Sequence, residues 1–521
     1  MEGVSGARLM GRWRRGASEM DGEAEDEDVT AGAEARTQAK VGVVGWLFSP
    51  LRSSLWQPSV VSSGDPWRGK DYRDVDAGER ALWGLGQDKP EHLFYLVHGL
   101  GGSPGDLKYL KKVLYDQVHG TGSVLVHACR SNFVNPNNVE RLVGLERRRQ
   151  PHEVGTYQGV HAGGAKAAEE LLQVVRDFPS LKRLTLVGNS LGGLFARYLA
   201  GRLWEARKGT IAGLEPVDYM SIASPHLGTR SYLWQGSFPR WMHERLTPMW
   251  GHSCVQLMYL DGSGPHRHVE GHRRPMFLRM GTEDDPDDLP FLAALRAFRR
   301  RTCYANCWGD SLVSYETAGL DFRPGSTPDP KQFPRGRAGI VREEYLPAGC
   351  FEDEAEDMEA EFAELERQCT GEKALRKAWS DVPLGFEKRV VRGLTRGMGW
   401  TRVTCHFPRR LFRSGLADGV LFPSSHNKIC ANKRNRYYSS TCHEGESVMQ
   451  HAAAILLSDP PTAGADDGGI DAKVLRDVIG VKAVARAKST PRARNGVADA
   501  PSVPAPETAL EGRPKTSRRR R

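Results

Sequence analysis

The sequence predicts a fold of the α/β class, with a mostly parallel central sheet and helices on both of its faces. Short apolar runs indicate buried strands, and longer segments with apolar residues three or four positions apart indicate helices. The expected strands are residues 93–97, 124–128, 184–187, 217–224, 303–308 and 401–406, and the expected helices are residues 103–118, 163–178, 193–200 and 447–457. Because strands and helices alternate along the chain, the strands are expected to run parallel.

Composition divides the 521 residues into three parts. Residues 1–88 contain charge blocks, Gly, Ser and Pro without sustained periodicity, and we expect a disordered leader. Residues 89–459 form the expected folded domain. Residues 460–521 are poor in aromatic residues and rich in Ala, Pro and Arg, which indicates a disordered basic tail.

Two insertions are expected within the domain, over the edge of the sheet where ligands bind in open α/β folds. The first, at about residues 230–295, is irregular and rich in Trp, Met and His. It is a candidate lid, and the alternative is an ordinary loop on the protein surface. The second, at about residues 335–397, has an acidic half (352–366) and a basic half (373–396) that we expect to pair with each other.

The formal net charge of +9 is concentrated near the C-terminus, because residues 460–521 carry 13 Lys and Arg against 7 Asp and Glu. The folded domain is therefore close to balanced, and no nucleic-acid partner is expected. Residues 470–488 fit a short basic amphipathic helix for peripheral membrane contact. Since this segment lacks Trp and Phe, a solvated tail is favoured.

Cysteine usage indicates a reducing, intracellular compartment, since the nine cysteines form no Cys-x-x-Cys pair and no secretory signal is evident. The longest candidate anchor, residues 41–48, is far shorter than the roughly 20 apolar residues of a spanning helix. We therefore expect a protein that is cytoplasmic or peripheral to membranes. Arginines near the N-terminus leave organellar targeting as an alternative, against which Glu2 and the acidic run at 21–28 argue.

The segment from Gly188 to Gly192 has the pattern Gly-x-Ser-x-Gly between an expected strand and an expected helix. A strand that turns abruptly into a helix holds its corner residue in a strained conformation, and the small flanking residues relieve the crowding. The corner residue, Ser190, is then exposed above the helix N-terminus, where negative charge is favoured. We predict that Ser190 is a nucleophile; the alternative is a serine in a flexible loop.

The strand at 93–97 runs into His98-Gly99-Leu100-Gly101-Gly102, a glycine-rich turn in which the main chain can approach a ligand closely. On the α/β-hydrolase pattern, the amides of Leu100 and Leu191 would bind an oxyanion. An ordinary strand-to-helix turn is the alternative.

A base and an orienting acid are expected after the nucleophile. Asp310 follows a strand, where a carboxylate can accept a hydrogen bond from an imidazole, although a Gly-Asp pair also occurs in simple turns. His426 lies on an expected loop after the last core strand and is the predicted base. His406 and His443 remain competitors, and His451 is expected to pack inside a helix. The order Ser190, Asp310, His426 is the one expected of α/β-hydrolases.

Metal-ligand residue types occur at Cys405-His406, His426-x-x-x-Cys430 and Cys442-His443, but their spacing matches no zinc pattern. We expect no metal and no cofactor.

Taken together, these motifs resemble the putative serine-esterase, lipase-like family of eukaryotic α/β-hydrolases from about residue 90 to residue 457. The specific parts are the elbow with its continuation Ala196-Arg197-Tyr198, and the segments 97–102, 224–228, 304–310, 426–429 and 448–451. The resemblance implies Ser190 as nucleophile, Asp310 as acid and His426 as base. The family often has histidine where this chain has Asn189.

The expected function is hydrolysis of acyl esters of lipids through an acyl-enzyme. Related acyl-transfer or thioesterase chemistry is the first alternative, because the same residues serve it. A catalytically silent adaptor for a membrane or a protein is the second, although the full set of catalytic residue types argues against it.

Overall fold

The computed structural model describes residues 89–118, 123–133, 155–231, 247, 251–261, 274–282, 288–310, 312–323, 325–333, 338–351, 364, 367, 385–408, 424–432 and 442–459. All of them belong to the first of two compact units of the chain, residues 1–481. The expected leader, the expected tail and nearly all of the acidic half of the second insertion lie outside the described residues.

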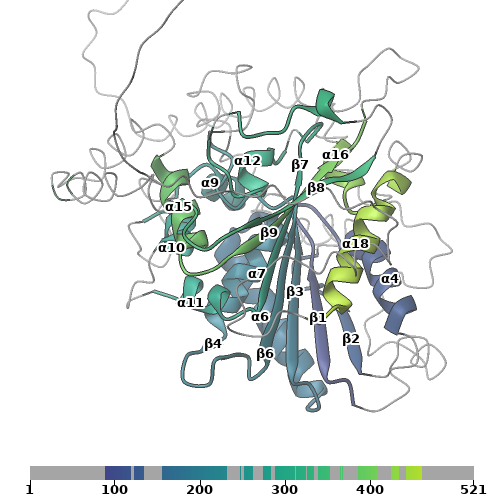
Figure 1. Cartoon of the computed structure of the whole chain (residues 1–521). Helices are drawn as coiled ribbons and strands as arrows, with labels where there is room; N and C mark the ends of the chain where they lie inside the picture. The colour runs from purple at the N-terminus through teal and green to yellow at the C-terminus, as the bar shows by residue number, and fades with distance from the viewer. Residues whose placement is uncertain are drawn as a thin grey trace, which may run out of the picture. The chain divides into compact units, whose positions relative to one another are not determined.

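A seven-stranded sheet forms the centre of the domain (Figure 1). Its strands are β1 (His92–Val97), β2 (Val124–Ala128), β3 (Arg183–Asn189), β6 (Glu215–Ile222), β7 (Arg300–Asn306), β8 (Gly339–Leu346) and β9 (Trp400–His406). They lie in the order β2-β1-β3-β6-β7-β9-β8, and all neighbouring pairs are parallel except β8 with β9.

Helices cover both faces of this sheet, so the predicted α/β-hydrolase class is confirmed. Alternate residues of β1 enter opposite cores: Leu93 and Tyr95 pack in one, and Phe94 and Leu96 pack in the other. Because both faces are covered, every residue of β1 is buried, which explains its continuous apolar run. Figure 1 shows the helices of the first core, α6 (Val160–Asp177) and α7 (Leu191–Arg202), across the sheet from α4 (Lys108–Val118) and α18 (Glu446–Leu457).

The strand order reverses between β1 and β3. The chain leaves β1 for β2 on one side and then crosses back over β1 to reach β3 on its other side. In open α/β sheets, ligands bind outside the carboxyl ends of the strands at such a switch point. The turn at 98–102 follows β1 and Ser190 follows β3, so the topology places both at this position.

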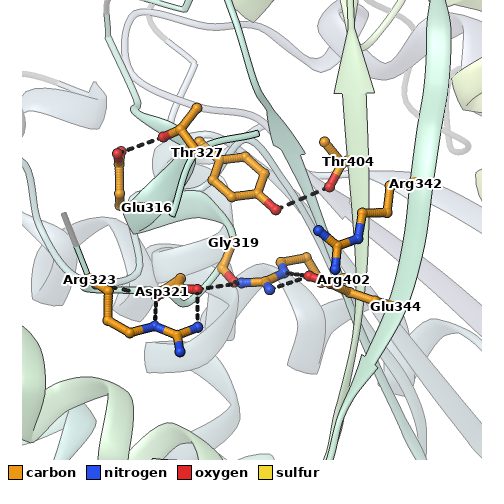
Figure 2. A network of polar contacts seen from close by, with 10 residues as sticks. Glu316, Gly319, Asp321, Arg323, Thr327, Arg342, Glu344, Arg402 and Thr404 are labelled. Atoms are coloured by element: carbon orange, nitrogen blue, oxygen red, sulfur yellow. Dashed lines mark hydrogen bonds and ion pairs between the residues drawn. The ribbon is translucent and has the colours of Figure 1, made fainter. Parts of the chain in front are cut away.

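Strand β8 was not expected. It lies within the range predicted to form the second insertion, but it extends the central sheet at its edge. Its alternation is weak, with one exposed and several half-buried side chains, as is typical of an edge strand. Figure 2 shows what holds it: Arg402 on β9 pairs with Glu344 on β8, donates to the Gly319 carbonyl at 3.0 Å and contacts Asp321 at 3.3 Å. This buried guanidinium therefore joins the sheet edge to the segment that follows Asp310.

The first insertion is irregular in sequence but contains short helices: α9 (His252–Leu257), α10 (Met276–Gly281) and α11 (Phe291–Arg296). The apolar side chains of α10 and α11, with Leu257 of α9, enter the same core as those of α7 and α15 (Gly385–Thr395), whereas Val255 of α9 lies in a separate small cluster. Helices of six residues are too short for an apolar period to be visible in the sequence. The remaining elements are η2 (Pro104–Leu107), η4 (Gly155–Tyr157), β4 (Trp204–Glu205), β5 (Thr210–Ile211), α12 (Tyr315–Ala318), η7 (Pro330–Gln332), α16 (Ser424–Lys428) and η8 (Cys442–Gly445).

In the described part of the chain, every helix lacks the length or the apolar character that crossing a lipid bilayer requires.

Candidate active site

Ser190 occupies a strained corner between β3 and α7. Its φ of 54° and ψ of −128° lie in a region that non-glycine residues rarely adopt, at a cost of about 1–3 kcal/mol. The backbone amide of Ser190 donates to the Ile222 carbonyl at 2.8 Å, which fixes the corner to β6. Ser190 is half-buried, whereas an exposed side chain was expected; its neighbours on both sides are buried, so the elbow raises this residue out of the sheet.

The glycines flanking Ser190 are required by space. A Cβ atom on Gly188 would overlap the backbone of Gly193, and a Cβ atom on Gly192 would overlap the Val97 carbonyl oxygen at the end of β1. Only glycine lets β3, α7 and β1 approach one another this closely.

The turn after β1 lies directly against the elbow. A Cβ atom built on Gly99 would lie 2.6 Å from the Ser190 Cβ and 3.2 Å from its Oγ. Among the described residues, the amides of Leu100 and Leu191 donate to no hydrogen bond, whereas the Gly101 amide donates to Thr156 Oγ1 at 2.8 Å. The two predicted oxyanion donors are thus available on the segments that flank the serine.

Asp310 accepts several hydrogen bonds in a loop just beyond β7. One carboxylate oxygen, Oδ1, accepts the amides of Leu312 at 3.1 Å and Val313 at 2.9 Å. The other, Oδ2, accepts the Asn306 side-chain amide at 2.8 Å and lies 2.9 Å from His426 Nδ1. The side chain of Asp310 is only 1% exposed, so its orientation is fixed by contacts on both oxygens.

His426 was expected on a loop and instead lies in the short helix α16. The amide of Ser425 donates to the Gly309 carbonyl at 3.3 Å, which holds this helix beside the Asp310 loop. Since an ionised carboxylate can only accept, the contact with Asp310 places the ring proton on Nδ1. Nε2 is then left as an acceptor, which is the form that a general base requires.

The competing histidines have other surroundings. His406 is buried at the end of β9, where burial lowers its pKa and its ring contacts Cys307 at 3.7 Å. His443 is exposed. His451 packs against the sheet, as expected, with Nδ1 2.9 Å from the Tyr304 hydroxyl. Of these four histidines, the structure brings only His426 to Asp310.

Asn189 links the elbow to the segment that carries His426, a contact that the sequence did not reveal. Its side-chain amide lies 3.0 Å from the Cys430 sulfur, four residues beyond His426. Burial, followed by the charge of Asp106, raises the pKa of Cys430, so this residue remains a neutral thiol. The position where the family often has histidine therefore serves here to join the nucleophile segment to the base segment.

A buried ion pair was also missed from the sequence. Lys428 Nζ lies 3.2 Å from Glu444 Oε2, and their side chains are 1% and 4% exposed. The pair joins α16 to η8, and Gly445 lets the Lys428 carbonyl approach closely. Lys428 and Glu444 are 16 positions apart on irregular segments, so no period could have predicted their contact.

Side chains of the types that bind metals occur at the cysteine and histidine positions named in the sequence analysis. Within the described ranges, no group of three or more His, Cys, Asp or Glu side chains is arranged to hold a metal ion.

Comparison with known proteins finds similarity to putative esterases and lipases. Residues 87–322 match the family described as putative serine esterase (DUF676). Over this span, the chain is similar to the putative serine esterases. The matched serine-esterase segment contains Ser190 and Asp310, whereas His426 lies beyond it. The family resemblance expected from the motifs is confirmed.

The putative lipases to which the chain is similar come from yeasts. Putative lipase ROG1 of Saccharomyces cerevisiae is 26% identical over 238 residues, covering 45% of this chain and 29% of the relative. Putative lipase C4A8.10 of Schizosaccharomyces pombe is 25% identical over 240 residues, covering 45% and 26%. The chain therefore spans less than a third of the length of these relatives.

Among solved structures, the RedJ thioesterase from the prodiginine biosynthetic pathway in Streptomyces coelicolor aligns with 44% of this chain and 75% of its own, at 17% identity and a TM-score of 0.21. This TM-score is too low to assign a function to the chain. The family match covers residues 87–322, and the fungal relatives are described as putative lipases.

Proposed function

We propose that this protein is a serine hydrolase of the lipase or carboxylesterase type, which cleaves acyl esters of lipids through Ser190, His426 and Asp310. The observation that carries the proposal is the 2.9 Å contact between His426 Nδ1 and Asp310 Oδ2, made by a base segment that is joined to the nucleophile elbow.

In the proposed reaction, Nε2 of His426 takes the proton of the Ser190 hydroxyl as its oxygen attacks the ester carbonyl. The amides of Leu100 and Leu191 donate to the oxyanion that forms, at the N-terminus of α7. His426 returns the proton to the leaving alcohol, which leaves an acyl group on Ser190. Water, deprotonated by His426, then releases the carboxylic acid and restores the serine. Asp310 keeps the ring in the required tautomer throughout.

A lipid substrate is favoured by two apolar side chains. Phe133 and Trp308, at 38% and 39% exposure, are the large hydrophobic residues exposed in the described part of the chain. Both follow the carboxyl ends of strands, β2 and β7, which is the edge of the sheet that carries Ser190. Aromatic side chains at this edge suit a substrate presented at a membrane surface.

A fluorophosphonate probe tests the nucleophile. Purified wild-type protein should be labelled, and Ser190→Ala, with an unchanged melting temperature, should not. A folded wild type that the probe leaves unlabelled would reject the hydrolase in favour of an adaptor.

Two further comparisons test the base and the reaction type. His426→Ala should abolish turnover of a soluble acyl ester, whereas the exposed His443→Ala should retain it; the reverse result would reject the assigned base. Matched oxygen and thiol esters of one acyl chain separate esterase from thioesterase chemistry, because preference for the thioester would contradict the proposal.

A further inference from the structure

The turn from Gly99 to Gly102 has a defined geometry. The Gly102 amide donates to the Gly99 carbonyl at 3.0 Å, and Gly101 has a φ of 58°, as in turns of type II. The Gly99 carbonyl oxygen also lies 3.1 Å from Nδ1 of His98. Because the N–H of a trans peptide points away from its C=O, holding this carbonyl directs the Leu100 amide to the opposite side.

The next peptide of the turn is held by a side chain. Turns of types I and II differ mainly in the orientation of the central peptide, which here joins Leu100 to Gly101. Its N–H donates to Thr156 Oγ1 at 2.8 Å, and Thr156 is buried. The hydroxyl thus stabilises the orientation seen in the structure. This peptide shares the Cα atom of Leu100 with the peptide that carries the Leu100 N–H, so loss of the Thr156 contact loosens the position of that donor.

Thr156 is itself held by the first insertion. Ser253, on α9, donates its hydroxyl to the Thr156 carbonyl at 2.6 Å and accepts the Gly159 amide at 2.9 Å. One turn further along α9, Gln256 accepts the Val160 amide at 2.6 Å. The side chains of Ser253 and Gln256 are fully buried, so their polar groups depend on these contacts for hydrogen bonding.

We propose that Thr156 is a positioning residue of the oxyanion turn, and that α9 supports it through Ser253. The chain of contacts runs from the first insertion through Thr156 to Gly101, one residue beyond the proposed donor Leu100. This inference rests on the proposed function. It assigns to the insertion a role in assembling the catalytic site, in addition to any role in covering it.

A positioning role and a purely structural role predict different kinetics. The oxyanion exists in the transition state and not in the bound ester, so a misdirected Leu100 amide lowers kcat while leaving KM nearly unchanged. It also weakens binding of a trifluoromethyl ketone, which forms a tetrahedral adduct with the serine. A purely structural hydroxyl would lower the melting temperature without either effect.

The test compares Thr156→Val with Thr156→Ser and with Thr185→Val. Thr185 is a matched control because its hydroxyl is equally buried, bonds with His92 at 2.9 Å and lies in the interior of the sheet, away from the oxyanion turn. For a soluble acyl ester, Thr156→Val should lower kcat about 10- to 100-fold, with KM within about twofold. The inhibition constant of the ketone should rise by a similar factor. Thr156→Ser should recover most of the activity, and Thr185→Val should lose stability only.

Ser253→Ala keeps the proposal testable if Thr156→Val does not fold. It should lower kcat in the same direction, at constant KM and by a smaller factor. The proposal is overturned if these variants keep the wild-type kcat, or if Thr156→Ser fails to restore it in a folded protein. An inactive wild type would instead overturn the proposed function, so the two failures are distinguishable.

Discussion

Replacing Asp310 with asparagine tests the proposed triad most sharply, because the structure indicates how the variant would rearrange. Asparagine offers one acceptor and one donor where the carboxylate offers two acceptors. Its oxygen is expected at the Oδ1 position, since the amides of Leu312 and Val313 are fixed backbone donors. Its NH2 group then faces Asn306 and His426.

Both of these neighbours can adapt. The Asn306 Oδ1 atom has no hydrogen-bond partner among the described residues, so its amide can flip and accept from the new NH2 group. His426 can accept at Nδ1 only by moving its proton to Nε2, which removes the lone pair that would take the serine proton. The fold should therefore survive while the base is held in the wrong tautomer.

The expected loss in kcat is about 10⁴-fold, the magnitude seen when a triad aspartate is replaced by asparagine elsewhere. At 1.36 kcal/mol per tenfold change, this corresponds to about 5 kcal/mol of transition-state stabilisation. The assay is kcat for a soluble ester, with the melting temperature measured alongside. A folded Asp310→Asn protein that retains activity within tenfold of wild type would refute the tautomer argument.

Three further predictions concern other parts of the domain. Gly192→Ala should abolish activity or folding, because its Cβ would overlap a carbonyl oxygen of β1, whereas Gly105→Ala, whose nearest new contact is at 3.5 Å, should be tolerated in both assays. Lys428→Met should reduce the free energy of unfolding by about 3–5 kcal/mol by leaving a buried charge, and adding Glu444→Leu should restore most of it; equal stabilities of the single and double variants would contradict this. Burial raises the pKa of Asp261 to about 7, above the value of about 3.9 in an unfolded chain, so its contribution to stability is present below pH 4 and is lost as the pH rises through 7. Asp261→Asn should therefore raise the melting temperature relative to wild type more at pH 8 than at pH 4, and a difference independent of pH would exclude this effect.

Much of the fold could be predicted because its strands are parallel and buried on both faces. Such strands are continuous apolar runs, as in β1 and β3, and these were assigned to within two residues. Strand β8 was not predicted, because it is an antiparallel edge strand whose side chains are mostly half-buried. The short helices of the first insertion were missed for a related reason, since six residues show no clear period.

The candidate site was predictable where a residue is tied to a strand end, as for Ser190 and Asp310. His426 could be ranked against the other histidines only by its place after the last strand, and the structure adds the contact that distinguishes it. Side chains that hold the site in place gave no such signal. Thr156 and Ser253 are 97 positions apart, and their partners are backbone groups that any residue possesses.

This asymmetry has a physical cause. The groups proposed to react must lie at the carboxyl edge of a parallel sheet, so the order of the strands already restricts where they occur in the chain. The side chains that position the reacting groups need only form hydrogen bonds with buried donors and acceptors. Many conformations of the connecting segments could supply such hydrogen bonds. In this protein the first insertion supplies them through Ser253, and it therefore contributes to the proposed oxyanion site without containing any of the predicted catalytic residues. A comparison of Ser253→Ala with Thr156→Val measures how much of the catalytic geometry depends on that insertion.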